Sequence, residues 1–155
     1  MPNQLDLPPV YTVIAIIAVV VLGWIGNAVG AVLGGGFWGF ICVVVGIGLI
    51  GWSGYLFREY QTTLIPRKTA DALVMDGPFV VSRNPMYLGM VLITLGVGII
   101  VGPVIAYIPA FFLAVYLDRN FIQPEERKLV EQFGKEAELY IEDTAKWIGY
   151  GPIKI

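Results

Sequence analysis

The chain has 155 residues and a formal net charge of −2, with 57% hydrophobic residues, one cysteine and no histidine. The scattered basic residues exclude the basic stripe of a nucleic-acid-binding protein, and a single cysteine excludes an internal disulfide. Without histidine the chain lacks the commonest metal ligand and general base, so we expect no metal site. Such high hydropathy does not suit a soluble domain, whose surface must be polar.

Two long stretches without charge predict membrane-spanning helices. No charged residue occurs between Asp6 and Arg58, or between Arg83 and Asp118. A charge at the bilayer centre costs about 2.5–3.5 kcal/mol, so uncharged apolar runs of about 18 residues or more indicate spanning helices. We predict an all-α membrane protein, one domain over residues 1–155, with about four transmembrane helices and a C-terminal amphipathic helix.

The first uncharged stretch holds two predicted spans, at about residues 10–33 and 37–57. The glycine run 34–36 between them predicts a turn, because consecutive glycines are poor helix formers. Further glycines in the second span would let another helix approach closely. These are Gly46, Gly48, Gly51 and Gly54.

The second uncharged stretch holds two shorter runs, at about residues 85–101 and 104–117, separated by a turn at Gly102 and Pro103. Each run is short for a bilayer core about 30 Å thick. Two tilted helices, a re-entrant hairpin or one poorly formed span are all compatible with this pattern, and we favour a hairpin of two helices. Gly96 and Gly98 predict close helix packing or, alternatively, backbone access for a ligand.

The polar residues gather in two patches, at 58–84 and 118–155. In the second patch, apolar residues three or four apart predict one amphipathic helix from Glu125 to Trp147. Nearly all basic residues lie in these patches and none in the two short turns. By the positive-inside rule, both patches and both termini are predicted to be cytoplasmic.

The first patch ends in a motif at the start of a predicted helix, Ser82-Arg83-Asn84-Pro85-Met86-Tyr87-Leu88-Gly89. An arginine there can hold a carboxylate in a two-pronged contact, and the helix start favours an anion. Alternatively, Asn84 caps the helix, Pro85 occupies its first turn and Arg83 pairs with a lipid phosphate.

The second patch begins with Glu125 and Glu126 at a predicted helix start. The helix dipole stabilises carboxylates there, which is a sufficient structural reason for the pair. Alternatively, one glutamate binds a ribose, an amine or a cationic centre. Tyr87 and Tyr140 are predicted either to stack on a ring or to anchor the chain at the interface.

Together the two motifs resemble the integral-membrane methyltransferases, the family of isoprenylcysteine carboxyl methyltransferase and the phospholipid N-methyltransferases. The resemblance covers roughly residues 61–147. Its first part comprises Pro66, Leu73-Val74, Asp76-Gly77-Pro78-Phe79 and the Ser82–Gly89 motif. Its second part comprises Glu125-Glu126-Arg127, Leu129, Phe133-Gly134, Tyr140 and Lys146-Trp147.

The resemblance implies S-adenosylmethionine as methyl donor, a cofactor pocket enclosed by the C-terminal segment, and a lipidic acceptor that arrives from the bilayer. It implies Arg83 and Glu126 as the catalytic residues. The implied cofactor-binding residues are Arg83, Asn84, Pro85, Tyr87, Gly89, Glu125, Glu126 and Tyr140.

The chain departs from the pattern of the prenylcysteine enzymes, which usually have histidine where it has Asn84. A common tyrosine is Ala137 here, and a common arginine is Lys146. The acceptor therefore stays open between the carboxylate of a prenylcysteine-like group and the amine of a phospholipid. Two other functions are alternatives: a nicotinamide-dependent membrane reductase of the sterol reductase type, and a non-catalytic membrane protein.

Overall fold

The computed structural model describes residues 7–30, 36–62 and 72–149, and within these ranges the chain forms helices and no strand. Four helices are apolar: α1 (Pro8–Ala28), α2 (Gly36–Glu59), α3 (Pro85–Val101) and α4 (Ile108–Leu117). The predicted all-α membrane fold is confirmed. Part of the glycine turn at 34–36, the end of the first predicted span and Pro66 lie outside the described residues.

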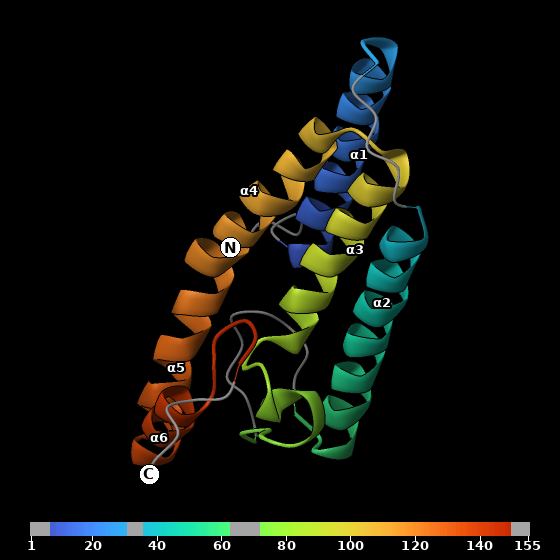
Figure 1. The fold of residues 1–155 in the computed structure, drawn as a ribbon. Helices are drawn as coiled ribbons and strands as arrows, with labels where there is room; N and C mark the ends of the chain where they lie inside the picture. The colour runs from blue at the N-terminus through green and yellow to red at the C-terminus, as the bar shows by residue number, and fades with distance from the viewer. Residues whose placement is uncertain (1–6, 31–35, 63–71, 150–155) are drawn as a thin grey trace.

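The apolar helices pack around α3, which contacts α1, α2 and α4 (Figure 1). Figure 1 shows α1 and α3 running in one direction and α2 and α4 in the other. The C-terminal ends of α2 and α4 and the N-terminal end of α3 therefore share one side of the bundle. This arrangement brings the two polar patches, which follow α2 and α4, to the same side.

Three helical stretches are long and apolar enough to cross a membrane: Pro8–Ala28, Gly36–Glu59 and Val104–Phe133. Helix α3 has 17 residues and is a shorter apolar helix. The turn between α3 and α4 falls at Gly102, as predicted, and Gly102 has a φ of 111° that favours glycine.

α4 ends at Leu117, the predicted end of the fourth apolar run, but the prediction that the spanning helix stops there is wrong, because the helical stretch continues for 16 more residues. A 3₁₀ turn, η2 (Val104–Tyr107), leads into α4, and a π-helical turn, η3 (Asp118–Ile122), joins α4 to α5 (Gln123–Phe133). This 30-residue stretch is about 45 Å long, which exceeds a bilayer core of about 30 Å. The polar helix α5 is therefore the extension of a membrane helix.

The single amphipathic helix predicted from Glu125 to Trp147 is also wrong. α5 ends at Phe133, and a second helix, α6 (Lys135–Asp143), follows after Gly134. Gly134 has a φ of 55°, which residues with a β-carbon rarely adopt and which is not helical, so the helix breaks there. After α6 the chain returns toward the start of α3 (Figure 1).

Glycines bring α2 and α3 into close contact. A β-carbon on Gly46 would lie 2.6 Å from the carbonyl oxygen of Gly89, and one on Gly39 would lie 2.5 Å from that of Gly96. Backbone approach of this kind is typical of membrane helices. The predicted packing role is confirmed for Gly46 and wrong for the three other predicted glycines, which have open space where a β-carbon would stand. These are Gly48, Gly51 and Gly54.

Candidate active site

Three consecutive polar residues, Ser82, Arg83 and Asn84, lie immediately before α3. Pro85 occupies the first turn, as predicted, and Asn84 stands at the N-cap position. The side chain of Asn84 makes no capping bond; instead its Nδ2 donates to the carbonyl oxygen of Lys146 at 3.2 Å. The hydroxyl of Ser82 accepts from the backbone N–H of Asn84 at 3.1 Å. The capping interpretation of the Asn84 side chain is therefore wrong.

Arg83 joins the two polar patches. Its Nε and Nη2 donate to Oε1 of Glu126 at 3.0 and 2.9 Å, and its Nη1 donates to the carbonyl oxygens of Ile141, at 2.6 Å, and of Thr144. The pair is largely buried, with side-chain exposures of 11% for Arg83 and 17% for Glu126. Arg83 thus holds α5 and the C-terminal end of α6 against the start of α3.

The contacts of Arg83 limit what else it can bind. A guanidinium carries five N–H donors, and the four contacts described above use four of them. At most one N–H is therefore left for a ligand. A ligand carboxylate would obtain a two-pronged contact with Arg83 only by displacing Glu126 or a backbone carbonyl.

Tyr87, four residues after Arg83 and in the first turn of α3, makes a similar contact with the neighbouring glutamate. Its hydroxyl donates to Oε1 of Glu125 at 2.8 Å, and the Tyr87 side chain is buried beside Phe121 of η3. Two neighbouring carboxylates on α5 therefore meet Arg83, just before α3, and Tyr87, in the first turn of α3. The structure thus brings together four residues implied by the resemblance, about 40 positions apart: Arg83, Tyr87, Glu125 and Glu126.

Residues 144–149, here called the C-terminal strap, lie along the start of α3. Backbone bonds join the strap to the residues before α3, and Trp147 packs against the apolar cluster that contains Tyr87. The strap contacts are Arg83 N to Ala145 O (2.9 Å), Ser82 Oγ to Lys146 O (3.4 Å) and Gly149 N to Val81 O (3.1 Å). The polar residues at the start of α3 are therefore covered by the C-terminal segment.

An ion pair that the sequence did not reveal anchors the same strap. Nζ of Lys146 lies 2.9 Å from Oδ1 of Asp118, and Nε2 of Gln123 donates to Oδ2 of Asp118 at 2.9 Å. From the sequence alone, Asp118 is only the first charged residue after an apolar run. Its place opposite Lys146 depends on the return of the chain after α6, which no sequence pattern predicts.

Tyr140 and Gly89 make packing contacts. The hydroxyl of Tyr140, which is 8% exposed, donates to the carbonyl oxygen of Phe79 at 2.9 Å. Phe79 lies in a 3₁₀ turn, η1 (Gly77–Val80), that precedes α3. Burial raises the pKa of Tyr140 well above its usual value of 10.0. Gly89 faces Gly46 of α2, so it supports helix packing at this position.

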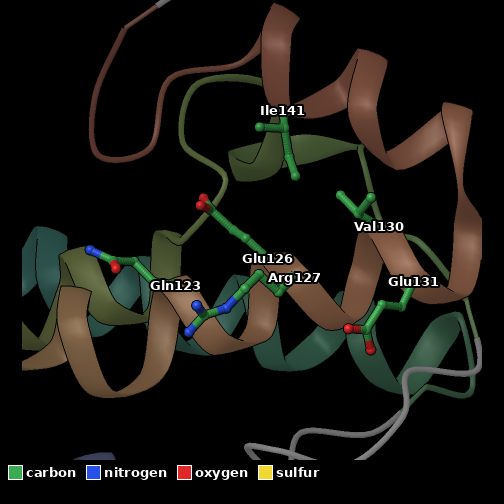
Figure 2. Close-up of a pocket in the computed structure, with 6 residues that line it drawn as sticks. All are labelled: Gln123, Glu126, Arg127, Val130, Glu131 and Ile141. Atoms are coloured by element: carbon green, nitrogen blue, oxygen red, sulfur yellow. The ribbon is translucent and has the colours of Figure 1, made fainter.

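A hollow of about 530 Å³ lies between α5 and α6, beside the ion pair of Arg83 and Glu126. Figure 2 shows Ile141 of α6 and Val130 of α5 extending into it, with the carboxylate of Glu126 at one side. The hollow thus combines apolar walls with charged groups. The lining residues are Gln123, Glu126, Arg127, Val130, Glu131 and Ile141.

Comparison with known families decides what kind of protein this is. Residues 36–136 match the profile of the phospholipid methyltransferase family, which is more than half of the chain. The chain belongs to the phospholipid methyltransferase family. The match runs from α2 to the beginning of α6, includes the Ser82–Gly89 motif and the Glu125-Glu126 pair, and confirms the family that the sequence motifs indicated. Comparisons with curated proteins and with solved structures gave no match.

Membership of the phospholipid methyltransferase family identifies the chain as a membrane methyltransferase. It favours methyl transfer over the reductase and over a non-catalytic role. The matched residues include Arg83, Tyr87, Glu125 and Glu126, whereas Tyr140, Ile141 and the strap follow the matched region.

Proposed function

We propose that the chain transfers a methyl group from S-adenosylmethionine to a lipidic acceptor at the bilayer surface. The observation that supports this proposal most is the meeting of the two motifs, with Glu126 on Arg83 and Glu125 on Tyr87. The contacts lie at the N-terminal end of the apolar helix α3, the level at which we expect lipid headgroups. From the positive-inside rule we expect this end to face the cytoplasm.

The chemistry of the residues fits this cofactor. Val130 and Ile141 offer apolar walls for an adenine ring. The two hydrogen bonds from Arg83 to Glu126 both fall on Oε1, so we assign Oε2 of Glu126 to a ribose hydroxyl or to the ammonium group. Two carboxylates also complement the positive charge of a sulfonium. When bound, S-adenosylmethionine supplies a methyl group that its sulfonium already activates.

Arg83 is the residue that we assign to the methionine carboxylate. With one N–H left over, it offers a single hydrogen bond, or a two-pronged contact if Glu126 changes partner. Asn84 and Pro85 fix the backbone at the helix start beside it. Arg83 and Glu126 act together, so replacement of either by alanine is expected to abolish cofactor binding.

The other task of the chain is to orient the acceptor and keep water away. A carboxylate acceptor needs no base, whereas a protonated amine must first lose a proton. Because the Arg83 guanidinium holds Glu126, we assign the role of the base that takes this proton to Glu125. The carboxylate of Glu125 accepts a hydrogen bond from the Tyr87 hydroxyl. The choice between the two acceptors then follows from the role of Glu125: only an amine requires it.

The test is transfer of a labelled methyl group. The purified chain in lipid vesicles is incubated with methyl-labelled S-adenosylmethionine and a membrane lipid extract, and the labelled product is identified. We expect a labelled lipid with the wild type and none with Glu126→Ala. Absence of label in every lipid fraction, with folded wild-type protein, would contradict the proposal, and oxidation of NADPH instead would favour the reductase.

A further inference from the structure

The π-helical turn η3 stands where the membrane helix α4 becomes the polar helix α5. Its backbone closes a ring one residue wider than an α-helix, because the N–H of Gln123 donates to the carbonyl oxygen of Asp118, five residues earlier. The turn is well packed, since Phe121 and Ile122 have no exposed surface. Isolated π turns inside α-helices often occur at functional sites.

Asp118 fixes this turn through its side chain as well as its backbone. Its carboxylate accepts from the side-chain amide of Gln123 at the far end of the turn, at 2.9 Å. The same carboxylate pairs with Lys146 of the C-terminal strap, also at 2.9 Å. Asp118 therefore ties together the two ends of η3 and the segment that covers the start of α3.

The width of the turn sets the direction in which α5 presents its side chains. An α-helix advances about 100° per residue, so one extra residue in a turn rotates everything after it by about that angle. Glu125 and Glu126 lie three and four residues after the end of η3, and both must face the start of α3. Without the extra residue, α5 would rotate by about 100°, and both carboxylates would leave Arg83 and Tyr87.

We propose that η3, held by Asp118, sets the rotation of α5 that brings Glu125 and Glu126 to the start of α3. Asp118 is a positioning residue: it contacts Gln123 and Lys146 and acts on the site through them. The geometric part of this inference stands on the contacts alone. Its consequence for methyl transfer rests on the proposed function.

The first experiment removes the extra residue by deletion of Asn120, an exposed residue of the turn. A double-mutant cycle with Arg83→Ala and Glu126→Ala is measured by thermal unfolding in detergent, with and without the deletion. We expect the two effects to be strongly non-additive in the full-length chain and additive in the deletion variant. Undiminished non-additivity in the deletion variant would overturn the proposal.

Binding of S-adenosylmethionine, measured by calorimetry, gives a second readout. We expect the deletion to weaken the affinity at least tenfold and Asn120→Ala, the matched control, to change it less than twofold. A wild-type affinity that survives the deletion would overturn the inference. If the wild type itself fails to bind the compound, the proposed function fails, and the double-mutant cycle still decides whether η3 sets the rotation.

A second variant keeps the chain length, in case the deletion prevents folding. With Asp118→Ala, we expect the KM for S-adenosylmethionine to rise at least fivefold, and Asp118→Asn to recover most of this loss, since its amide oxygen still accepts from Gln123. A purely structural role would lower the active fraction, and with it the apparent kcat, but leave KM unchanged. An unchanged KM in Asp118→Ala would overturn the proposal.

Discussion

Two regions of the molecule hold distant segments together by different physical means. Inside the membrane, α2 and α3 meet through glycines whose missing side chains let backbone touch backbone, as at Gly46 and Gly89. At the polar end of α3, the segments meet through donors and charges, as at Arg83 and Glu126. Lipid tails are as apolar as the helices, so shape decides the first contact, whereas directed hydrogen bonds decide the second.

Helix α3 takes part in both regions and so links them. Gly89, which packs on α2, is two residues from Tyr87, which contacts Glu125. The membrane contact thus fixes the helix whose first turn carries Tyr87 and which Arg83 directly precedes. Substitutions should therefore act through volume in one region and through charge and donors in the other.

The largest effect is expected for Arg83→Ala. The substitution leaves the largely buried Glu126 carboxylate without its partner and removes the donor from two carbonyl oxygens at the end of α6. Breaking a buried ion pair from one side costs about 3–5 kcal/mol, and we expect about 3 kcal/mol because the pair keeps some exposure. Thermal or chemical unfolding in detergent measures this loss.

Arg83→Lys is the matched control, since it keeps the charge but loses the fork of donors. We expect it to lie between wild type and Arg83→Ala in stability and to bind S-adenosylmethionine weakly. If lysine supported full stability and affinity, charge alone would be sufficient, and the directed hydrogen bonds would not define this region.

The membrane contact is tested by Gly46→Ala. The new methyl group would meet the Gly89 carbonyl oxygen at 2.6 Å, so α2 and α3 must separate, at a cost of about 1–3 kcal/mol. Gly48→Ala is the control, because nothing lies within 4 Å of that site and alanine favours helix by up to about 1 kcal/mol. Thermal unfolding of both variants should give opposite signs; equal signs would refute the shape argument.

A smaller effect is expected for Tyr140→Phe, which removes the hydrogen bond to Phe79, at about 1 kcal/mol near neutral pH. The pKa of Tyr140 is raised by burial in the folded state, so the folded chain keeps its proton where the unfolded chain loses it. Stability should therefore fall as pH rises above about 10, and less so in the phenylalanine variant. Parallel pH profiles of the two proteins would contradict this assignment.

The smallest effect on stability is expected for Lys146→Met. The ion pair with Asp118 is more exposed than that of Arg83, at 31% and 24%, so its loss should cost less than about 1 kcal/mol. Its contribution should also shrink with added salt, which screens exposed charges. Unfolding measured at low and high salt should show a difference between variant and wild type only at low salt.

Much of the fold could be predicted from the sequence, because charge is so costly in lipid that the uncharged runs mark the helices. The loss of apolar character correctly marks the end of the fourth run at Leu117, but it does not reveal that the helical stretch continues through η3 into α5. A helix can leave the membrane without breaking, so a change in polarity at 118 says nothing about backbone geometry. Likewise, the apolar stripe from 125 to 147 ran through Gly134, where the backbone turns.

The candidate site was predictable in its residues but not in its pairings. The motifs named Arg83, Tyr87, Glu125 and Glu126, and the structure brings them together. The partners of each residue depend on the rotation of α5 and on the return of the chain after α6. The π turn η3 sets the rotation of α5, and the irregular C-terminal strap brings the chain back. Neither feature produces a repeating pattern of apolar residues, so the sequence does not reveal it.

The central claim is that the place where the two motifs meet binds S-adenosylmethionine, and calorimetry on the detergent-solubilised chain tests it most directly. The wild type should bind S-adenosylmethionine saturably and show no heat with NADPH. Arg83→Ala and Glu126→Ala should abolish binding, whereas Gly48→Ala should bind like the wild type. Unchanged affinity in both site variants, or no binding by the folded wild type, would contradict the account.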